Sequence, residues 1–416
     1  MKKIGVGLIG MGTVGSGTAK ILIENAEEIS LRTGLEIELK KIAVRDKTKP
    51  RYDGVQSFII TDDAEEIVND ENIDIVVEVM GGTILAKRYI KAAFRNKKSV
   101  VTANKDLLAL YIKELFDDSF NRGCHFGYEA AVAGAVPILR AINTSFKSDN
   151  ISEITGIVNG TTNYILTKMK YDSKDFKTAL KEAQDLGYAE ADPTSDIEGI
   201  DAARKAAVLS SLAFHSPVVL GDVYVEGITN ITPEDIYIAS KLNHTIKLCA
   251  NLKETQEGIE SAVYPLLIAN DDFIGKVENS FNGIFLHSDY AGECFMYGKG
   301  AGELPTASAI VSDIIEIAQK IAYEDKVKRS IVFYKNKKVL KIENTVNGWL
   351  IRAENDISDF LNENGIKNIK LLGTEKIVAV YPIKQSTLFE TLNKFNGKIT
   401  SKIRVKGDLL WNGKVF

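Results

Sequence analysis

The sequence has few of the residues that disulfide, thiol and zinc sites need. Its 416 residues include three cysteines and four histidines. The cysteines stand singly, without a Cys-x-x-Cys pair, which argues against both a disulfide framework and a thiolate metal site. The histidines are isolated and lack His-x-x-x-His spacing, which argues against a zinc-dependent alcohol dehydrogenase. We expect the protein to work in the reducing cytoplasm.

The sequence also lacks a strong charge excess and a long apolar run. The formal net charge is −4, and no cluster of lysine and arginine is interleaved with aromatic residues, so we expect no nucleic-acid partner. The apolar run at residues 3–9 is closed by glycines and is too short for a signal peptide or a membrane span. These absences favour a cytoplasmic protein that acts on a small molecule.

A glycine pattern stands near the N-terminus. The strand-like run at residues 3–9 is followed by Gly10, Gly12 and Gly15, and a helical pattern then continues to about residue 25. In a dinucleotide fingerprint the first glycine permits a tight turn, the second lets a pyrophosphate approach the backbone, and the third allows close packing of helix on strand. We predict a dinucleotide site here that includes the first helical residues, Thr13 and Val14.

Strand and helix patterns alternate up to about residue 102, which predicts βαβ units and a parallel sheet. From about residue 136 the pattern changes to that of a second, α+β domain. A helix at 306–322 follows a glycine-rich turn, and we expect it to dock back on the first domain. The other elements expected are strands at 37–44, 73–79, 99–102, 151–158 and 281–288, and helices at 63–69, 85–97, 174–186 and 198–213.

The last ninety residues have a separate pattern of expected strands and helices. Two halves, each with strand-like and helical stretches, predict the order βαββαβ, the split βαβ sandwich. The lysine-rich stretch around Lys335–Lys341 is predicted to be a solvated hairpin and linker. The elements expected in this tail are strands at 348–353, 366–372, 375–382 and 399–405, and helices at 356–363 and 387–395.

An arginine lies beside an acid where the second strand is expected to end, at Arg45 and Asp46. An acid at this place favours the 2′-hydroxyl of NAD, whereas an arginine can pair with the 2′-phosphate of NADP. We interpret Arg45 as favouring NADP, with a plain surface charge as the alternative.

A dense run of carboxylates at residues 187–205 ends in a predicted helix. Asp201 and Lys205 are four residues apart, so they share one face of that helix. When an alcohol is oxidised by hydride transfer, a group must take the hydroxyl proton, and a partly desolvated lysine can do so. Lys205 is the candidate for this role. Periodicity alone favours the alternative, a routine surface ion pair.

Lys105 follows a predicted strand end, at the edge where open α/β sheets bind ligands, so we interpret it as functional rather than as a plain surface charge. Two other classes stay open. Cys124, with His125 beside it, would suit an acylating aldehyde dehydrogenase, although adjacent strand residues point to opposite faces. A nicotinamide-sensing regulator without catalysis is the second alternative.

Six segments together resemble the homoserine dehydrogenase family, in the family's order and over about residues 1–325. The resemblance implies an NAD(P)-dependent oxidoreductase that interconverts L-homoserine and L-aspartate 4-semialdehyde in threonine, methionine and isoleucine biosynthesis. The segments are Glu78–Gly82, Val101–Lys105, Val158–Asn163, Gly187–Pro193, Asp196–Lys205 and Gly300–Thr306.

The resemblance also implies roles for individual residues. Glu190 would hold the amino group of homoserine, and Asp201 and Lys205 would flank its hydroxyl, with Lys205 shuttling the proton. Lys105 would lie between nicotinamide and substrate. The remaining residues implied for the substrate pocket are Asp196, Asn159, Gly160 and Thr161, and Gly302 is implied for the cofactor site.

The turn at residues 128–136 resembles the family's monovalent-cation loop, with a buried glycine-alanine hinge as the alternative. The ligands of a sodium ion would be Glu129 with the carbonyls of Val132, Gly134 and Val136.

The tail resembles an ACT domain, but Arg352–Phe360 lacks the Asp-x-Pro-Gly loop of threonine-binding members. The tail would then serve oligomer contacts or bind another amino-acid effector. We predict an α/β protein of at least two copies: a Rossmann domain at 1–135 and 300–325, an α+β catalytic and dimerisation domain at 136–299, and an ACT-like βαββαβ domain at 328–416.

Overall fold

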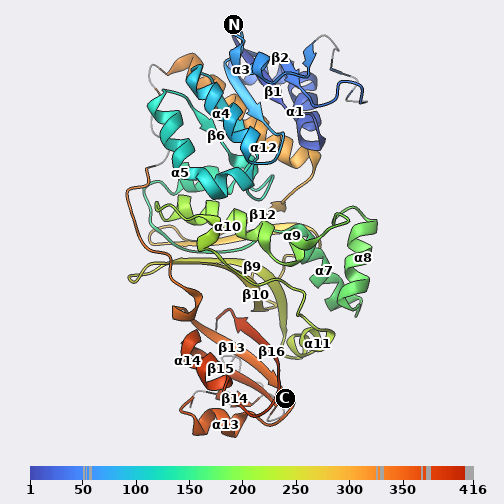
Figure 1. Cartoon of the computed structure of the whole chain (residues 1–416), viewed down its shortest axis with the longest axis vertical. Helices are drawn as coiled ribbons and strands as arrows, with labels where there is room; N and C mark the ends of the chain where they lie inside the picture. The colour runs from blue at the N-terminus through green and yellow to red at the C-terminus, as the bar shows by residue number, and fades with distance from the viewer. Residues whose placement is uncertain are drawn as a thin grey trace. The chain divides into compact units, whose positions relative to one another are not determined.

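The computed structural model describes residues 1–49, 52, 54–55, 59–324, 327, 332–366, 369–371 and 376–407. The chain forms two compact units (Figure 1). The first comprises residues 1–150, 207–220 and 298–336, and the second comprises residues 151–206, 221–297 and 337–416.

The first unit contains a parallel sheet of order β3-β2-β1-β4-β5-β6. β4 and β5 are buried along their whole length, as expected for parallel strands that are covered on both faces. The strand order reverses between β1 and β4, and open α/β sheets bind ligands at such a switch point. The strands are β1 (Lys2–Ile9), β2 (Leu35–Ala43), β3 (Ile60–Thr61), β4 (Ile75–Glu78), β5 (Ser99–Thr102) and β6 (Phe126–Gly127).

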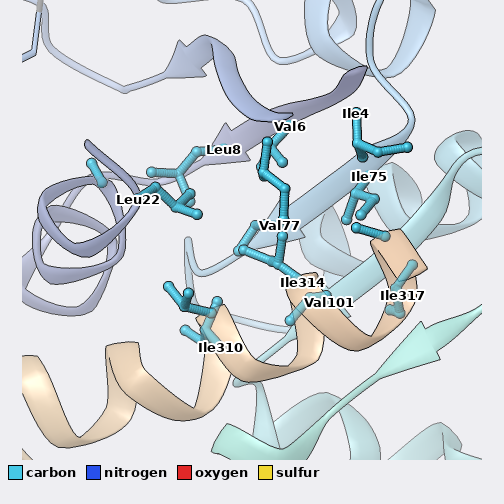
Figure 2. Close-up of a cluster of buried hydrophobic side chains, with 14 of the residues drawn as sticks. Ile4, Val6, Leu8, Leu22, Ile75, Val77, Val101, Ile310, Ile314 and Ile317 are labelled. Atoms are coloured by element: carbon cyan, nitrogen blue, oxygen red, sulfur yellow. The ribbon is translucent and has the colours of Figure 1, made fainter. Parts of the chain in front are cut away.

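The long helix α12 (Glu303–Tyr323) packs in this unit although it lies far along the chain. Its residues Ile310, Ile314 and Ile317 recur at helical spacing and meet the apolar side chains of the sheet (Figure 2). The predicted docking of this helix on the first domain is confirmed. The other helices of the unit are α1 (Thr13–Glu24), α2 (Ala26–Thr33), α3 (Glu65–Asn69), α4 (Ile84–Arg95), α5 (Lys105–Asn121), η2 (Glu129–Ala131), α6 (Ile138–Arg140) and η3 (Ala141–Ser145). The short helix η4 (Leu220–Asp222) is divided between the two units after Leu220.

The second unit is built on one mixed sheet whose main path is β12-β11-β7-β9-β10-β16-β13-β15-β14, with β8 beside β10. α10 (Ile200–Ala213) belongs to this unit up to Ala206. The strands before the tail are β7 (Ile151–Ile157), β8 (Tyr224–Val225), β9 (His244–Glu254), β10 (Ile259–Ala269), β11 (Phe281–Ser288) and β12 (Gly292–Lys299). The other helices are α7 (Gly160–Tyr171), α8 (Phe176–Asp185), α9 (Thr194–Ile197) and α11 (Pro233–Lys241).

The tail has the predicted order βαββαβ, and its own strands pair antiparallel. β16 also pairs in parallel with β10, so the tail extends the sheet of the second unit. The division into three domains therefore stays a prediction. The tail elements are η5 (Ile342–Asn344), β13 (Val346–Ala353), α13 (Ser358–Glu363), β14 (Ile369–Leu371), β15 (Ile377–Lys384), α14 (Gln385–Leu392) and β16 (Ile399–Val405).

Several features of the chain differ from the sequence analysis, which did not predict elements such as α5, β9 and β10. The predicted hairpin around Lys335–Lys341 is wrong, because residues 332–338 are irregular and Val339 forms a parallel bridge with Ile259. Helix α7 was not predicted. Eight of its twelve residues are buried, so the alternation of apolar and polar residues that marks a surface helix is missing.

Candidate active site

The glycine turn joins β1 to α1 in the first unit. Gly10 has a φ of +105°, and a Cβ added there would lie 2.7 Å from the carbonyl oxygen of Val79. A Cβ added at Gly15 would lie 2.2 Å from the carbonyl oxygen of Gly10. At Gly12 an added Cβ would meet nothing within 4 Å. The geometry therefore matches a tight turn, a close helix–strand contact and open space over the backbone.

Among the residues that the structure describes, no N-cap side chain forms a hydrogen bond with the first amides of the helix that follows the turn. Its N-cap, Gly12, has no side chain, and the first turn carries no acidic residue. Thr13 is exposed and Val14 is half-buried. The unpaired N–H groups and the positive end of the helix dipole favour an anionic ligand such as a pyrophosphate.

A second helix start lies against α1. Gly302 is the N-cap of α12 and has a φ of +113°. A Cβ added at Gly17 in α1 would lie 2.8 Å from Cγ of Glu303 and 3.1 Å from Cβ of Ala307. The first turn of α12 therefore packs against α1 one turn after the glycine turn.

The residues after β2 leave both interpretations of Arg45 open. Arg45 is exposed and lies two residues beyond the strand. The Asp46 carboxylate accepts hydrogen bonds from the backbone N–H and the hydroxyl of Thr48, at 2.9 and 2.6 Å. The acid is therefore engaged in a local turn, whereas the arginine presents its charge to solvent.

A buried carboxylate that the sequence analysis assigned no role ends β4. Glu78 accepts hydrogen bonds from the Thr102 hydroxyl at 2.8 Å and from the Asn104 amide at 3.3 Å, and burial raises its pKa. Asn104 is also the N-cap of α5 and accepts from the backbone N–H of Leu107. This network fixes the start of α5, where Lys105 is the first, half-buried residue. The signal was an acid at the end of an otherwise apolar strand.

The second unit brings together the residues predicted for proton transfer. Asp201 and Lys205 lie one turn apart on α10, and Lys205 Nζ donates to Asp201 Oδ2 and to the Val158 carbonyl, both at 2.7 Å. The side chain of Lys205 is 12% exposed and that of Asp201 is 11% exposed. The surface ion pair that periodicity left open is therefore wrong, because this pair is largely buried. Removing one partner of such a pair leaves the other charge uncompensated.

Asn159 connects this ion pair to α7 and α9. As the N-cap of α7, its Oδ1 accepts from the backbone N–H and the hydroxyl of Thr162, both at 2.9 Å. Its Nδ2 donates to Asp196 at 2.7 Å and to Asp201 at 2.9 Å. Burial and the charge of Asp201 raise the pKa of Asp196. We call Asn159, Asp196, Asp201 and Lys205 the substrate cluster.

The first turn of α7 lies beside this cluster. The Thr161 hydroxyl donates to the carbonyl of Tyr188 at 2.6 Å, so its side chain ties α7 to the carboxylate-rich segment. A Cβ added at Gly160 would lie 2.6 Å from the Ser280 carbonyl oxygen, so only glycine fits there. Both residues are held in place by backbone contacts.

Glu190 stands apart from the substrate cluster in its contacts. Its side chain is exposed, and its carbonyl accepts a hydrogen bond from the Gln184 amide at 3.1 Å. Its carboxylate has no hydrogen-bond partner among the residues that the structure describes.

The predicted cation loop contains a second buried carboxylate. Glu129 accepts hydrogen bonds from the backbone N–H groups of Leu139 and Arg140, at 3.1 and 2.6 Å, and donates its own N–H to Asp313. The Arg140 guanidinium pairs with Asp313 at 2.8 Å. Burial, together with the Asp313 charge, raises the pKa of Glu129 to about 7, and burial raises that of Asp313 to about 6. Two buried acids thus share one nearby arginine.

The three other residues predicted as cation ligands, Val132, Gly134 and Val136, are also buried. Gly134 is in addition closely surrounded by backbone atoms. A Cβ added at Gly134 would lie 2.6 Å from the Gly300 carbonyl oxygen, and φ there is +51°. The Val136 carbonyl accepts the N–H of Ile138 at 2.8 Å, and Val132 is fully buried.

The thiol alternative does not fit the structure. Cys124 is buried and its thiol donates toward the Phe94 carbonyl. Burial raises its pKa to about 11, the opposite of what a thiolate nucleophile needs.

Comparisons with known proteins identify the family. One family model, "Homoserine dehydrogenase, NAD binding domain", matches residues 10–129, and another, "Homoserine dehydrogenase", matches residues 137–315. The homoserine dehydrogenases of Bacillus subtilis and Helicobacter pylori are each 44% identical to the chain, over 77% of its length and 74% and 75% of theirs.

Solved structures agree with these matches. A homoserine dehydrogenase from Thiobacillus denitrificans has a TM-score of 0.89 at 35% identity and covers 98% of this chain and 99% of its own. A hyperthermophilic archaeal homoserine dehydrogenase mutant in complex with NADPH has a TM-score of 0.65 at 27% identity, covering 76% of this chain and 98% of its own. Among the described residues no helix has the length and apolar character to cross a membrane. The chain belongs to the homoserine dehydrogenase family, and the predicted NAD(P)-dependent oxidoreductase is confirmed.

Proposed function

We propose that the substrate cluster binds homoserine and that Lys205 carries the proton of its reacting oxygen. The supporting observation is the hydrogen bonding of Lys205 Nζ. An ammonium has three N–H donors, and two are used by Asp201 and Val158. The third has no partner among the described residues and is available to a substrate oxygen.

The proton accounting follows from this arrangement. Oxidation of homoserine to the semialdehyde removes a hydride from carbon and a proton from oxygen, and Lys205 receives that proton directly or through a water. In the reverse direction the Lys205 ammonium returns a proton to the carbonyl oxygen. Asp201 accepts a hydrogen bond from the amine and holds it in place.

The glycine turn fits a nicotinamide dinucleotide. Open space over Gly12 and the unpaired amides of α1 would hold the pyrophosphate, with Thr13, Val14 and Gly302 beside it. When bound, the nicotinamide accepts or supplies the hydride. We propose that Arg45 accommodates a 2′-phosphate, because Asp46 is engaged with Thr48, so NADP is accepted. Lys105, at the strand edge where ligands bind, would contact cofactor or substrate.

The two ends of homoserine need opposite charges. The exposed carboxylate of Glu190, which has no partner among the described residues, would hold its ammonium group. The N-terminal turn of α7, with Asn159, Gly160 and Thr161, would line the pocket, and Asp196 would complete its acidic side. These assignments rest on the family resemblance and on the buried hydrogen bonds of the cluster.

A monovalent cation fits the Glu129 loop on charge. When ionised, Glu129 and Asp313 carry two negative charges, whereas the nearby Arg140 carries one positive charge and also pairs with Glu316 at 3.2 Å, so a sodium ion would offset the excess. Its ligands would be Glu129 and the carbonyls of Val132, Gly134 and Val136, the last of which already accepts a hydrogen bond.

We also infer a cytoplasmic homodimer or larger homo-oligomer whose ACT-like tail binds an amino-acid effector. Three free cysteines, two of them buried, suit a reducing compartment. The βαββαβ order supports the ACT-like assignment of the tail.

The test of this function is an absorbance assay of the purified chain with homoserine and each dinucleotide in turn. We expect homoserine-dependent formation of reduced nicotinamide, faster with NADP than with NAD. Binding of the dinucleotide without turnover would contradict the proposal and favour a sensing role.

A further inference from the structure

A buried arginine of the tail contacts the rest of the second unit. Arg404 on β16 is 1% exposed, and its guanidinium carbon lies 4.2 Å from the ring centre of Tyr264 and 4.6 Å from that of Trp349. Its Nη2 donates to the Gln385 side chain of α14 at 2.9 Å. Arg404 is therefore locked by aromatic rings and by a tail helix, and its charge needs a partner.

That partner lies outside the tail. Arg404 Nη1 donates to Glu226 Oε2 at 2.8 Å, and the Glu226 backbone N–H donates to the Val263 carbonyl of β10 at 2.8 Å. Glu226 follows β8 directly and begins a short irregular stretch. We call residues 225–228 the support segment.

The support segment lies under the turn between α9 and α10. The N–H of Ile228 donates to the Ile197 carbonyl at 2.8 Å. A Cβ added at Gly227 would lie 2.3 Å from the same oxygen, and one added at Gly199 would lie 3.2 Å from Cγ1 of Val225. The two backbones are thus in direct contact, without room for a side chain between them.

We propose that Arg404 is a positioning residue for the substrate cluster. Asp196 lies just before the turn between α9 and α10, and Asp201 lies just after it. Asn159 Nδ2 donates a hydrogen bond to each of these two carboxylates. By holding Glu226, Arg404 fixes the support segment, and the support segment fixes the spacing of the two carboxylates. This inference rests on the proposed role of the cluster in binding homoserine.

The test compares variants of the full chain by steady-state kinetics. We expect Glu226→Ala to raise the KM for homoserine about tenfold, with kcat and the KM for the dinucleotide within about twofold. Glu226→Gln keeps an acceptor oxygen for Arg404 and should recover most of the wild-type KM. A folded Glu226→Ala variant with the wild-type KM for homoserine would overturn the proposal.

A double variant tests the same proposal in case Glu226→Ala does not fold. Arg404→Met with Glu226→Gln removes both charges together, so neither variant side chain leaves the buried Arg404 charge or its partner charge uncompensated. It should show the same rise in the KM for homoserine, and an unchanged KM would overturn the proposal.

A matched control breaks another ion pair of the tail. Lys406 pairs with Asp272 at the far end of the β10–β16 contact and does not touch the support segment. Lys406→Ala should leave the KM for homoserine within about twofold. An equal rise in this variant would show that tail attachment in general matters and would overturn the role of Arg404. Lys205→Ala, measured beside them, tests the cluster independently: full activity there would contradict the proposed function itself.

Discussion

The glycine turn of the first unit and the substrate cluster of the second are built in opposite ways. The turn depends on missing side chains: no atom lies within 4 Å of a Cβ added at Gly12, and its donors are backbone amides. The cluster depends on side chains that are buried and bonded to one another, with Asn159 and Lys205 each making two hydrogen bonds from one nitrogen. Adding atoms should therefore damage the turn, whereas removing atoms should damage the cluster.

The largest effect among the binding variants is expected at the turn. Gly12→Val places a branched side chain in space that the fold leaves open, so the chain should fold normally while the KM for the dinucleotide rises about 100-fold. The KM for homoserine should change little. Gly221→Val is the matched control, since Gly221 also has open space around it. Equal dinucleotide binding by the Gly12 variant and the control would contradict the proposed site.

A smaller effect is expected at Arg45, the residue proposed to distinguish NADP from NAD. Arg45→Ala removes an exposed charge and should raise the KM for NADP about tenfold while leaving that for NAD within about twofold. Arg32→Ala is a control, because Arg32 is an exposed arginine paired within α2. Unchanged affinity for NADP in the Arg45 variant would show that this arginine is a plain surface charge.

The smallest effect on activity is expected for Glu129→Gln. This variant should instead change how the free energy of unfolding depends on pH. The folded pKa of Glu129, about 7, is raised above the ordinary value of 4.5, so the folded chain binds the proton more tightly than the unfolded chain. Its contribution to stability is full below about pH 4.5 and is lost as the pH rises through about 7. Glu129→Gln should remove this loss, a relative gain on the order of 3 kcal/mol between these pH values.

The measurement is the free energy of unfolding of wild type and Glu129→Gln at several pH values, with potassium and with sodium. A sodium ion on the carboxylate would flatten the wild-type pH dependence, because the ion competes with the proton. Parallel curves for the two proteins in both salts would contradict both the raised pKa and the cation site.

The two regions also differ in how much of them the sequence could predict. The glycine spacing between an apolar run and a helical pattern predicts the turn, because few other structures need glycine at those three places. The substrate cluster gave a weaker signal, since Asp201 and Lys205 at helical spacing are more typical of a surface ion pair. Lys181 and Asp185 have the same spacing on α8, yet their side chains are 69% and 61% exposed. Burial separates the two pairs, and burial depends on tertiary packing.

The sequence analysis could not predict contacts between residues far apart in the chain, because these contacts also depend on tertiary packing. Arg404 and Glu226 are 178 residues apart, and nothing local marks either as a partner of the other. The order βαββαβ of the tail was predictable because each element has its own apolar period. Its pairing with β10, which brings Arg404 to Glu226, depends on the edges of two sheet segments meeting.

The central claim is that the buried amine of Lys205 moves the proton. The most direct test is the turnover number of Lys205→Ala for homoserine oxidation at saturating substrate and dinucleotide, beside Lys181→Ala as the exposed counterpart. We expect kcat of the first variant to fall by about 10²- to 10⁴-fold and that of the second to stay within about twofold. A folded Lys205→Ala enzyme that turns over as fast as the wild type would contradict the account.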